Sequence, residues 1–172
     1  ACGTSWHAGL IGKNLIERFA KVPVHVEYAS EFRYNRTLID NKSVVIAISQ
    51  SGETADTLAA IKKANDFGAI TIGICNVAGS SISRETDCGV FTRCGHEVGV
   101  ASTKAFTAQI SILYLFALKL ASAKKRISKS AMIAHLDFSS SLIKIKSILR
   151  KEDYIKKIAL KYKNASDFLY LG

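Results

Sequence analysis

The sequence is short of several features that mark particular classes of protein. It has one proline in 172 residues, and its four cysteines form no C-x-x-C pair, which excludes a proline-rich spacer and a disulfide scaffold. Its four histidines show no zinc-ligand spacing, so no metal site is predicted. Hydrophobic residues make up 48 %, which excludes a disordered polyelectrolyte. We expect a cytoplasmic protein with reduced thiols and a real core.

A long uncharged apolar run is also absent. The most apolar stretch, 105–123, contains only 14 residues without charge, between Lys104 and Lys119. As a helix this run spans about 21 Å, less than the roughly 30 Å hydrocarbon core of a bilayer. The first residues lack the basic and apolar regions of a signal peptide. These features predict a buried core helix and no membrane partner.

Positive charge is in excess, but it is confined to one segment. The net charge is +10, and residues 119–163 carry 13 Lys and Arg against three acidic residues. Isoleucine and leucine alternate with these lysines at helical spacing, so the lysines are interpreted as the solvated face of helices. No recognition motif and no regular aromatic interleaving accompany them, and we predict no nucleic-acid partner.

Strand-like and helix-like segments alternate along the chain. Strands are expected at 24–28, 43–48, 70–75, 88–92 and 168–171, the second and third as buried β-branched runs. Helices are expected at 6–21, 53–67, 102–124, 129–150 and 152–163, with a turn or short helix at 80–86. This order predicts an α/β fold, with a doubly wound parallel sheet flanked by helices in three layers.

Three loops rich in glycine and hydroxyl groups lie before predicted helices, where parallel sheets bind ligands. The strongest follows the strand 43–48, and its candidate residues are Ser49, Gln50, Ser51, Gly52 and Thr54. Free N–H groups and the helix dipole favour an anion there, although an ordinary N-cap explains the same residues, and both interpretations stay open. The other loops contribute Gly3, Thr4 and Ser5, and Val100, Ala101 and Ser102, with Ser102 expected as the N-cap of the core helix.

Five motifs occur in an order that points to one family. They are Ala-Cys-Gly-Thr-Ser at 1–5, Ala-Ser-Glu-Phe-Arg-Tyr at 29–34, Ser-Gln-Ser-Gly-Glu-Thr-Ala-Asp-Thr-Leu at 49–58, the stretch 76–81, and Gly-Val-Ala-Ser-Thr-Lys-Ala at 99–105. Together they closely resemble the first sugar-isomerase (SIS) domain of the glucosamine-6-phosphate synthase family, the glutamine–fructose-6-phosphate aminotransferases. The resemblance covers essentially the whole chain.

The resemblance implies a domain organisation and an activity. It assigns 1–128 to the first SIS domain without its first strand, 129–166 to a helical connector and 167–172 to the start of a second SIS domain. We therefore expect the chain to be one part of a larger protein. The family is homodimeric, carries a glutaminase domain, and makes glucosamine 6-phosphate from fructose 6-phosphate and glutamine without metal or organic cofactor.

The resemblance also implies roles for the loop residues. It makes Ser49, Gln50, Ser51 and Thr54 the cradle of the sugar phosphate, with Ser5 contacting either the phosphate or the sugar. Val100, through its backbone, and Ser102 are expected against the sugar hydroxyls. The family's acid and base residues lie in or beyond the second SIS domain, so this chain is expected to bind a hexose 6-phosphate and to catalyse nothing.

Alternatives remain open at this point. His96 or Glu97 could act as a general base, although a capping or surface role is the simpler interpretation. A phosphosugar-sensing SIS module of a regulator would be fused to a helix-turn-helix, which the sequence lacks. A stand-alone phosphosugar isomerase would carry its own acid/base pair.

Overall fold

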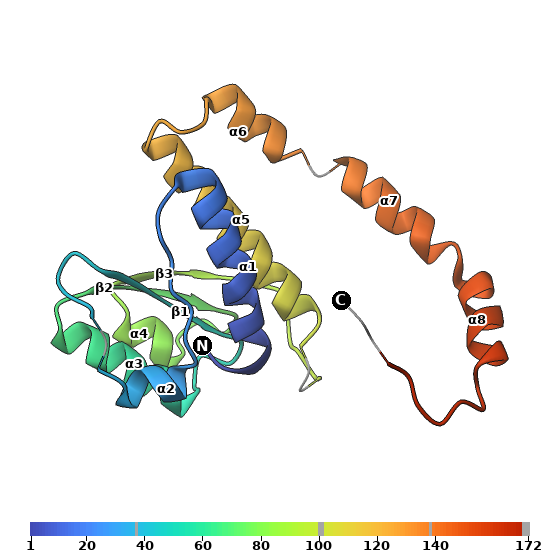
Figure 1. Cartoon of the computed structure of the whole chain (residues 1–172), viewed down its shortest axis with the longest axis horizontal. Helices are drawn as coiled ribbons and strands as arrows, with labels where there is room; N and C mark the ends of the chain where they lie inside the picture. The colour runs from blue at the N-terminus through green and yellow to red at the C-terminus, as the bar shows by residue number, and fades with distance from the viewer. Residues whose placement is uncertain (37, 100–101, 138, 170–172) are drawn as a thin grey trace. The chain divides into compact units, whose positions relative to one another are not determined.

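The computed structural model describes residues 1–36, 38–99, 102–137 and 139–169 (Figure 1). The chain forms two compact units, Ala1–Ser128 and Lys129–Gly172. Each unit is described by itself below, and the boundaries of the SIS domains remain a prediction.

A parallel sheet lies at the centre of the first unit. Its strands are β1 (Val44–Ser49), β2 (Ile70–Cys75) and β3 (Cys88–Phe91), in the order β1-β2-β3. All neighbours are parallel, with Ile46 opposite Ile72 and Gly73 opposite Gly89. The β-branched residues that predicted the first two strands therefore do form them, and the predicted α/β fold with a parallel sheet is confirmed.

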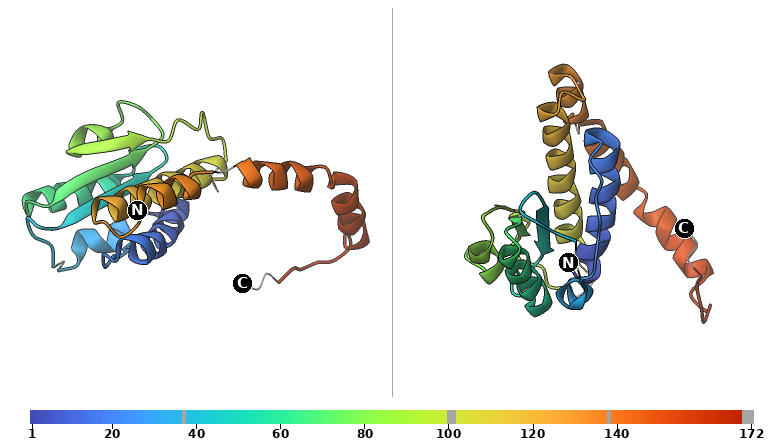
Figure 2. Two further views of the ribbon diagram at one scale, coloured as in Figure 1. Left: turned by 90° about the horizontal axis from the view of Figure 1, so that it is seen from above. Right: turned by 60° about the vertical axis from the view of Figure 1, so that its left-hand side comes forward.

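Helices cover both faces of this sheet (Figure 2). On one face, α1 (Gly3–Ala20) and α5 (Lys104–Ala123) enclose a core cluster of Ala8, Ile48, Ile74 and Leu113. On the other, α3 (Ala55–Asp66) and α4 (Ser81–Glu85) enclose a core cluster of Ala47, Ile61, Cys75 and Ile82. Adjacent strand residues thus point to opposite layers, as strand geometry requires.

The two helices on the first face run in the same direction along each other. Residues early in α1 contact residues early in α5, as Ser5 does with Gln109, and late residues meet late ones, as Ala20 does with Ala121. In the middle, a Cβ placed on Gly12 would lie 2.8 Å from a terminal carbon of Leu113. The absence of that Cβ lets the two helices pack closely, and their N-termini lie at the same end of the first unit.

The core helix α5 is slightly shorter than the helix predicted at 102–124. With 20 residues, α5 is long and apolar enough, by length and composition, to cross a membrane. The length of its charge-free run therefore does not exclude a span, and that part of the argument was wrong. Its packing is nevertheless that of a core helix, with Ala105, Leu113, Ala117 and Ala121 buried against α1 and the sheet.

Several features of the first unit differ from the sequence predictions. Residues 24–28 belong to no strand, because no described strand lies beside them to share hydrogen bonds. The sequence showed no helical periodicity at α2 (Ala29–Tyr34), which was not predicted and packs against α3. The first helix begins at Gly3 and not at Trp6, so the first candidate loop lies largely inside a helix.

The second unit contains α6 (Lys129–His135), α7 (Ser139–Leu149) and α8 (Glu152–Lys161). The single helix expected at 129–150 is thus two helices. Phe168 and Leu169 are in no strand, and the remainder of the strand predicted at 168–171 lies outside the described residues. Large apolar side chains are exposed in this unit: Ile133, Leu142, Ile143, Ile145, Ile148, Leu149, Tyr154, Ile155, Ile158, Leu160, Tyr162, Phe168 and Leu169.

Candidate functional site

The candidate site lies where the parallel strands end. The segment Ser49–Thr54, called the hydroxyl loop below, connects β1 to α3. Ser49 is only 3 % exposed, and its Oγ accepts a 3.0 Å hydrogen bond from the N–H of Gly52. The same oxygen lies 3.2 Å from Oγ1 of Thr54. The loop is thus held in a tight turn by its own first hydroxyl group.

Gly52 allows this loop to pass close to α4. Its φ is +71°, a region that favours glycine, and a Cβ at this position would overlap with the side chain of Ser80. The Gly52 carbonyl accepts a 3.0 Å hydrogen bond from the N–H of Ile82. Glycine is therefore required here both by conformation and by space.

The remaining loop residues anchor it to its neighbours. Oγ of Ser51, an exposed residue, accepts a 3.2 Å bond from the N–H of Glu53. The carboxylate of Glu53 accepts a 2.8 Å bond from the N–H of Ser81, and this hydrogen bonding lowers the pKa of Glu53. The carbonyl of Gln50 accepts from the N–H of Asn76, which directly follows β2.

The N-terminus of α3 is left without a side-chain cap of its own. Thr54 occupies the N-cap position, and its hydroxyl makes no hydrogen bond to the first turn of the helix. The first N–H groups of a helix carry partial positive charge and need acceptors. An anion bound in the hydroxyl loop would meet these groups together with the hydroxyls of the loop.

The N-terminus of α5 is instead occupied by a carboxylate. Oε2 of Glu97 accepts hydrogen bonds from Oγ of Ser102 at 3.1 Å and from the N–H groups of Thr103 and Ala105 at 3.2 and 3.3 Å. The Ala105 bond, the other bonds and the nearby Lys104 charge lower the pKa of Glu97, against a smaller opposing effect of burial. This geometry places Glu97 in the capping role.

Ser102 does not have the capping role expected of it. The N-cap residue of α5 is Thr103, and Ser102 lies outside the helix with its hydroxyl donated to Glu97. The sequence argument overlooked that a carboxylate five residues earlier could satisfy the start of the helix. Val100 and Ala101, the other candidates in this loop, lie outside the described residues.

The third group of candidates begins α1. Gly3 is exposed with φ +53°, Thr4 is half-buried, and Ser5 is 9 % exposed. Oγ of Ser5 accepts a 3.1 Å hydrogen bond from Nε2 of Gln109 in α5. One turn further along α1, Ala8 packs in the same cluster as Ile48, the residue before Ser49. Ser5 and the hydroxyl loop therefore lie at the same end of the sheet.

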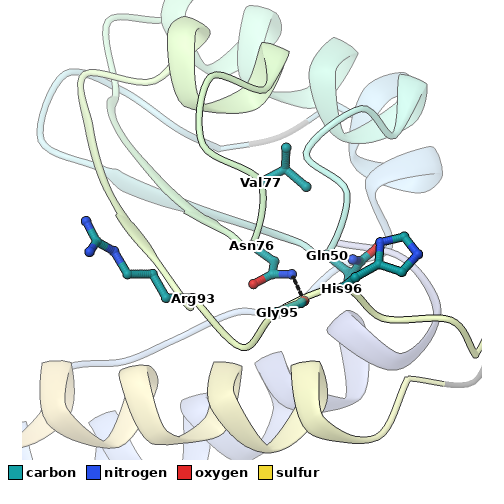
Figure 3. Close-up of a pocket in the computed structure, with 6 residues that line it drawn as sticks. All are labelled: Gln50, Asn76, Val77, Arg93, Gly95 and His96. Carbon is teal, nitrogen blue, oxygen red and sulfur yellow. Dashed lines mark hydrogen bonds between the residues drawn. The ribbon is translucent and has the colours of Figure 1, made fainter.

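A cavity of about 420 Å³ opens at this edge (Figure 3). It is lined by Gln50, Asn76, Val77, Arg93, Gly95 and His96, which follow the ends of the three strands. In Figure 3, Arg93 points away from Asn76 on one side, and His96 and Gln50 lie on the other. The sequence prediction named Gln50 as a site residue and His96 as a possible base, but it missed Arg93 and the cavity itself.

The Asn76 amide fixes the wall of the cavity. Its Oδ1 accepts from the N–H of Cys94 at 3.0 Å and from Oγ1 of Thr92 at 2.8 Å, and its Nδ2 donates to the carbonyl of Gly95 at 2.7 Å. One side chain thus holds the turn after β3, in which Arg93 has a φ of +50°. Asn76 was noted in the sequence as the start of the motif 76–81, but no role had been assigned to its amide.

Titratable groups in this edge do not form a metal site. No cluster of three His, Cys, Asp or Glu side chains that could hold a metal ion occurs among the described residues. Burial raises the pKa of the Cys75 thiol, at the end of β2, and so disfavours the reactive thiolate. What the described edge offers chemically is hydroxyl, amide and N–H donors, which suit an oxyanion.

The parallel sheet with helices on both faces defines an α/β class of domain, and comparison with known proteins identifies its family. Residues 1–119 match the model of the SIS domain family, and the chain belongs to that family. Among solved structures, the chain is similar to the "C-terminal domain of glucosamine-fructose-6-phosphate aminotransferase from Francisella tularensis", with a TM-score of 0.83 and 39 % identity. That match covers 95 % of this chain and 47 % of the other.

More particularly, the chain matches the SIS region of glutamine–fructose-6-phosphate aminotransferases (isomerizing). It is 54 % identical over 172 residues to the enzyme of Chlorobaculum tepidum and 52 % identical over 173 residues to that of Bacteroides thetaiotaomicron. Both matches cover the whole of this chain but only 28 % of the relative. The resemblance identified from the motifs is thereby confirmed, and the chain spans little more than a quarter of these relatives.

Proposed function

We propose that this chain is the sugar-phosphate-binding part of an enzyme that converts fructose 6-phosphate and glutamine into glucosamine 6-phosphate and glutamate. The phosphate group binds in the hydroxyl loop. The observation that carries the proposal is the hydroxyl loop itself, in which the hydroxyls of the buried Ser49 and of Thr54 lie 3.2 Å apart at the N-terminus of α3. The similarity to the aminotransferases supports the choice of a hexose 6-phosphate among possible anions.

The proposed phosphate cradle consists of Ser49, Gln50, Ser51, Gly52 and Thr54, with Gly3, Thr4 and Ser5 at the start of α1 completing it. Hydroxyls and backbone N–H groups reach three phosphate oxygens without a lysine, because a helix N-terminus already supplies positive potential. Val100, Ala101 and Ser102 remain assigned to the sugar on the strength of the resemblance alone. No cofactor and no metal enter the proposal.

Catalysis by this chain alone is not part of the proposal. The carboxylate of Glu97 already accepts hydrogen bonds at the start of α5. Apart from Arg93, His96 is then the ionisable residue that lines the cavity. We place the acid/base chemistry in other segments of a longer protein, which acts as a homodimer in the cytoplasm. Detectable interconversion of fructose 6-phosphate and glucose 6-phosphate by the purified 172-residue chain would overturn this division of labour.

Calorimetry on two variants of one residue tests the cradle. Thr54→Val removes the hydroxyl and keeps the shape, whereas Thr54→Ser keeps the hydroxyl. A hydrogen bond to a charged group contributes about 1.5–3 kcal/mol, so Thr54→Val should weaken fructose 6-phosphate binding about tenfold to a hundredfold. Thr54→Ser should stay close to the wild type.

The matched control is Thr107→Val on the exposed side of α5, where the one hydrogen bond of the hydroxyl among the described residues goes to the carbonyl of Thr103. It should leave the affinity unchanged. Equal affinities for the Thr54→Val variant and the wild type, or an equal loss in the control, would contradict the assignment.

A further inference from the structure

Gln109 is the polar exception on the buried side of α5. The other buried residues of this helix are all apolar: Ala105, Leu113, Ala117, Leu118 and Ala121. Gln109 is nevertheless only 1 % exposed. A buried amide must be hydrogen-bonded at both of its polar atoms to offset the water that it loses. An apolar side chain of similar size would stabilise this position more, so packing alone does not explain the glutamine.

The amide has one partner, and that partner belongs to the candidate site. Nε2 donates to Oγ of Ser5, which lies 104 residues earlier in the chain and is itself buried. Oε1 is buried and makes no hydrogen bond within the described part of the chain. Gln109 therefore leaves its Oε1 buried without a hydrogen bond, while its Nε2 holds the hydroxyl of Ser5 at the beginning of α1.

This contact determines what the Ser5 hydroxyl can do. A hydroxyl group has one proton and two lone pairs, and it rotates to suit its partners. When an amide N–H occupies a lone pair, the proton is left to be donated elsewhere. Phosphate oxygens are acceptors, so a serine held in this way is prepared to donate to a phosphate rather than to accept from a neighbour.

We propose that Gln109 is a positioning residue, which acts through Ser5 by orienting the hydroxyl of Ser5 as a donor to the sugar phosphate. The proposal rests on the proposed function, because it requires Ser5 to contact a hexose 6-phosphate. It adds to that function a residue of the helix core, outside every loop of the cradle. Gln109 itself does not touch the ligand.

The parallel packing of α1 and α5 makes the coupling direct. Ser5 and Gln109 lie one helical turn before Ala8 and Leu113, which pack together in the core. Both helices are anchored on each other at that turn, so the amide cannot move away from the hydroxyl without a shift of the core. The donor direction of Ser5 is thus fixed before the ligand arrives.

A double-mutant cycle tests the proposal in the 172-residue chain, with fructose 6-phosphate as the probe. Gln109→Met keeps the size and removes the donor, and it should weaken binding about threefold to tenfold in the wild-type background. In the Ser5→Ala background the same substitution should cause no further loss, because the hydroxyl through which it acts is gone. Equal losses in both backgrounds, or no loss in either, would overturn the proposal.

A packing control separates positioning from a general effect on the core. Leu118→Met changes another buried position of α5, away from the Ser5 contact, so its affinity should remain that of the wild type. Urea denaturation of all variants reports stability independently. A loss of affinity in Leu118→Met as large as that in Gln109→Met would assign the effect to packing.

A second measurement needs no substitution at Gln109. In NMR spectra, the side-chain amide protons of Gln109 should shift when fructose 6-phosphate is added to the wild type, and should not respond in Ser5→Ala. If the wild type binds no hexose 6-phosphate, the proposed function fails and this inference fails with it. If binding depends on Thr54 but the amide and the cycle show no coupling to Ser5, the proposed function stands and this inference alone fails.

Discussion

The helices α3 and α5 begin at the same end of the first unit, but their N-terminal N–H groups have different hydrogen-bond acceptors. At α5 the Glu97 carboxylate fills the N-terminus with three hydrogen bonds from its own chain. At α3 the N-cap residue, Thr54, turns its hydroxyl to Ser49 and leaves the first turn without a side-chain cap. Both termini carry the same partial charge, so the difference lies in which of them is available to an external anion.

This contrast favours the hydroxyl loop over the start of α5 as the proposed anion site. A parallel sheet brings helix N-termini to the carboxyl ends of its strands whatever the function. The Glu97 carboxylate already accepts the N–H groups at the start of α5, so that terminus is not free to bind an external anion. A loop that bonds to itself keeps the other terminus accessible and preformed. The predictions below alter the two termini in turn.

The largest effect is expected from Gly52→Ala, which breaks the open terminus. A left-handed φ costs a non-glycine residue about 1–2 kcal/mol, and overlap with Ser80 adds about 1–3 kcal/mol. Urea denaturation should therefore show a loss of about 2–5 kcal/mol in stability, together with a loss of phosphate binding.

Gly79→Ala is the matched control for this variant. Gly79 has a similar φ of +76°, but a Cβ there would meet nothing within 4 Å. Only the conformational cost of about 1–2 kcal/mol should remain. If both variants lose the same stability, the close approach of the hydroxyl loop to Ser80 does not contribute.

A moderate effect is expected when the filled terminus is opened by Glu97→Gln. The pKa of Glu97 is lowered in the folded protein, so its carboxylate stabilises the fold above the unfolded pKa of about 4.3. That stabilisation is lost as the pH falls through the lower folded pKa. Urea midpoints measured between pH 7 and pH 2 should therefore fall less steeply in the variant.

The pKa values of Glu53 and Asp87 are also lowered by hydrogen bonds, from Ser81 and Thr71 respectively, so acid sensitivity should persist in Glu97→Gln. Only the component due to the α5 terminus should disappear. A variant with the pH dependence of the wild type would show that Glu97 does not stabilise the start of this helix.

The sequence predicted the sheet better than the ends of the helices. Buried β-branched runs are a strong signal, and β2 was predicted to the residue. Residues 24–28, Val-His-Val-Glu-Tyr, were also predicted as a strand but have no described neighbouring strand, and strand formation depends on a partner that local composition cannot report. The start of α5 was misplaced for a related reason, because its acceptor comes from Glu97, outside the local capping pattern.

The candidate site was predicted unevenly for the same physical reason. The hydroxyl loop is a contiguous motif, so its residues could be named from the sequence. The contact between Ser5 and Gln109 joins positions 104 residues apart and leaves no local pattern except one glutamine in an apolar stretch. The Arg93 side chain enters the cavity wall only because Asn76 fixes the turn after β3.

The smallest effect is expected from Thr57→Val, in the first turn of α3. The Thr57 hydroxyl is buried and has no hydrogen-bond partner in the described part of the chain. Its removal should leave stability within about 0.5 kcal/mol of the wild type or raise it. Thr71→Val is the matched comparison, because the buried Thr71 hydroxyl bonds Asp87 at 2.9 Å, and that variant should be clearly destabilised. Similar stabilities for the two variants would contradict this interpretation.

The close contact of Gly12 with Leu113 determines how far α1 is shifted along α5, and so where Ser5 lies. Seven residues of α1 separate Gly12 from Ser5, a distance of about 10 Å along the helix axis. Because α1 and α5 are parallel, the notch at Gly12 sets the longitudinal alignment of one helix on the other. A sliding of α1 by one turn would carry the Ser5 hydroxyl about 5 Å from its amide partner. A glycine outside the proposed cradle therefore fixes the position of the Ser5 hydroxyl relative to Gln109.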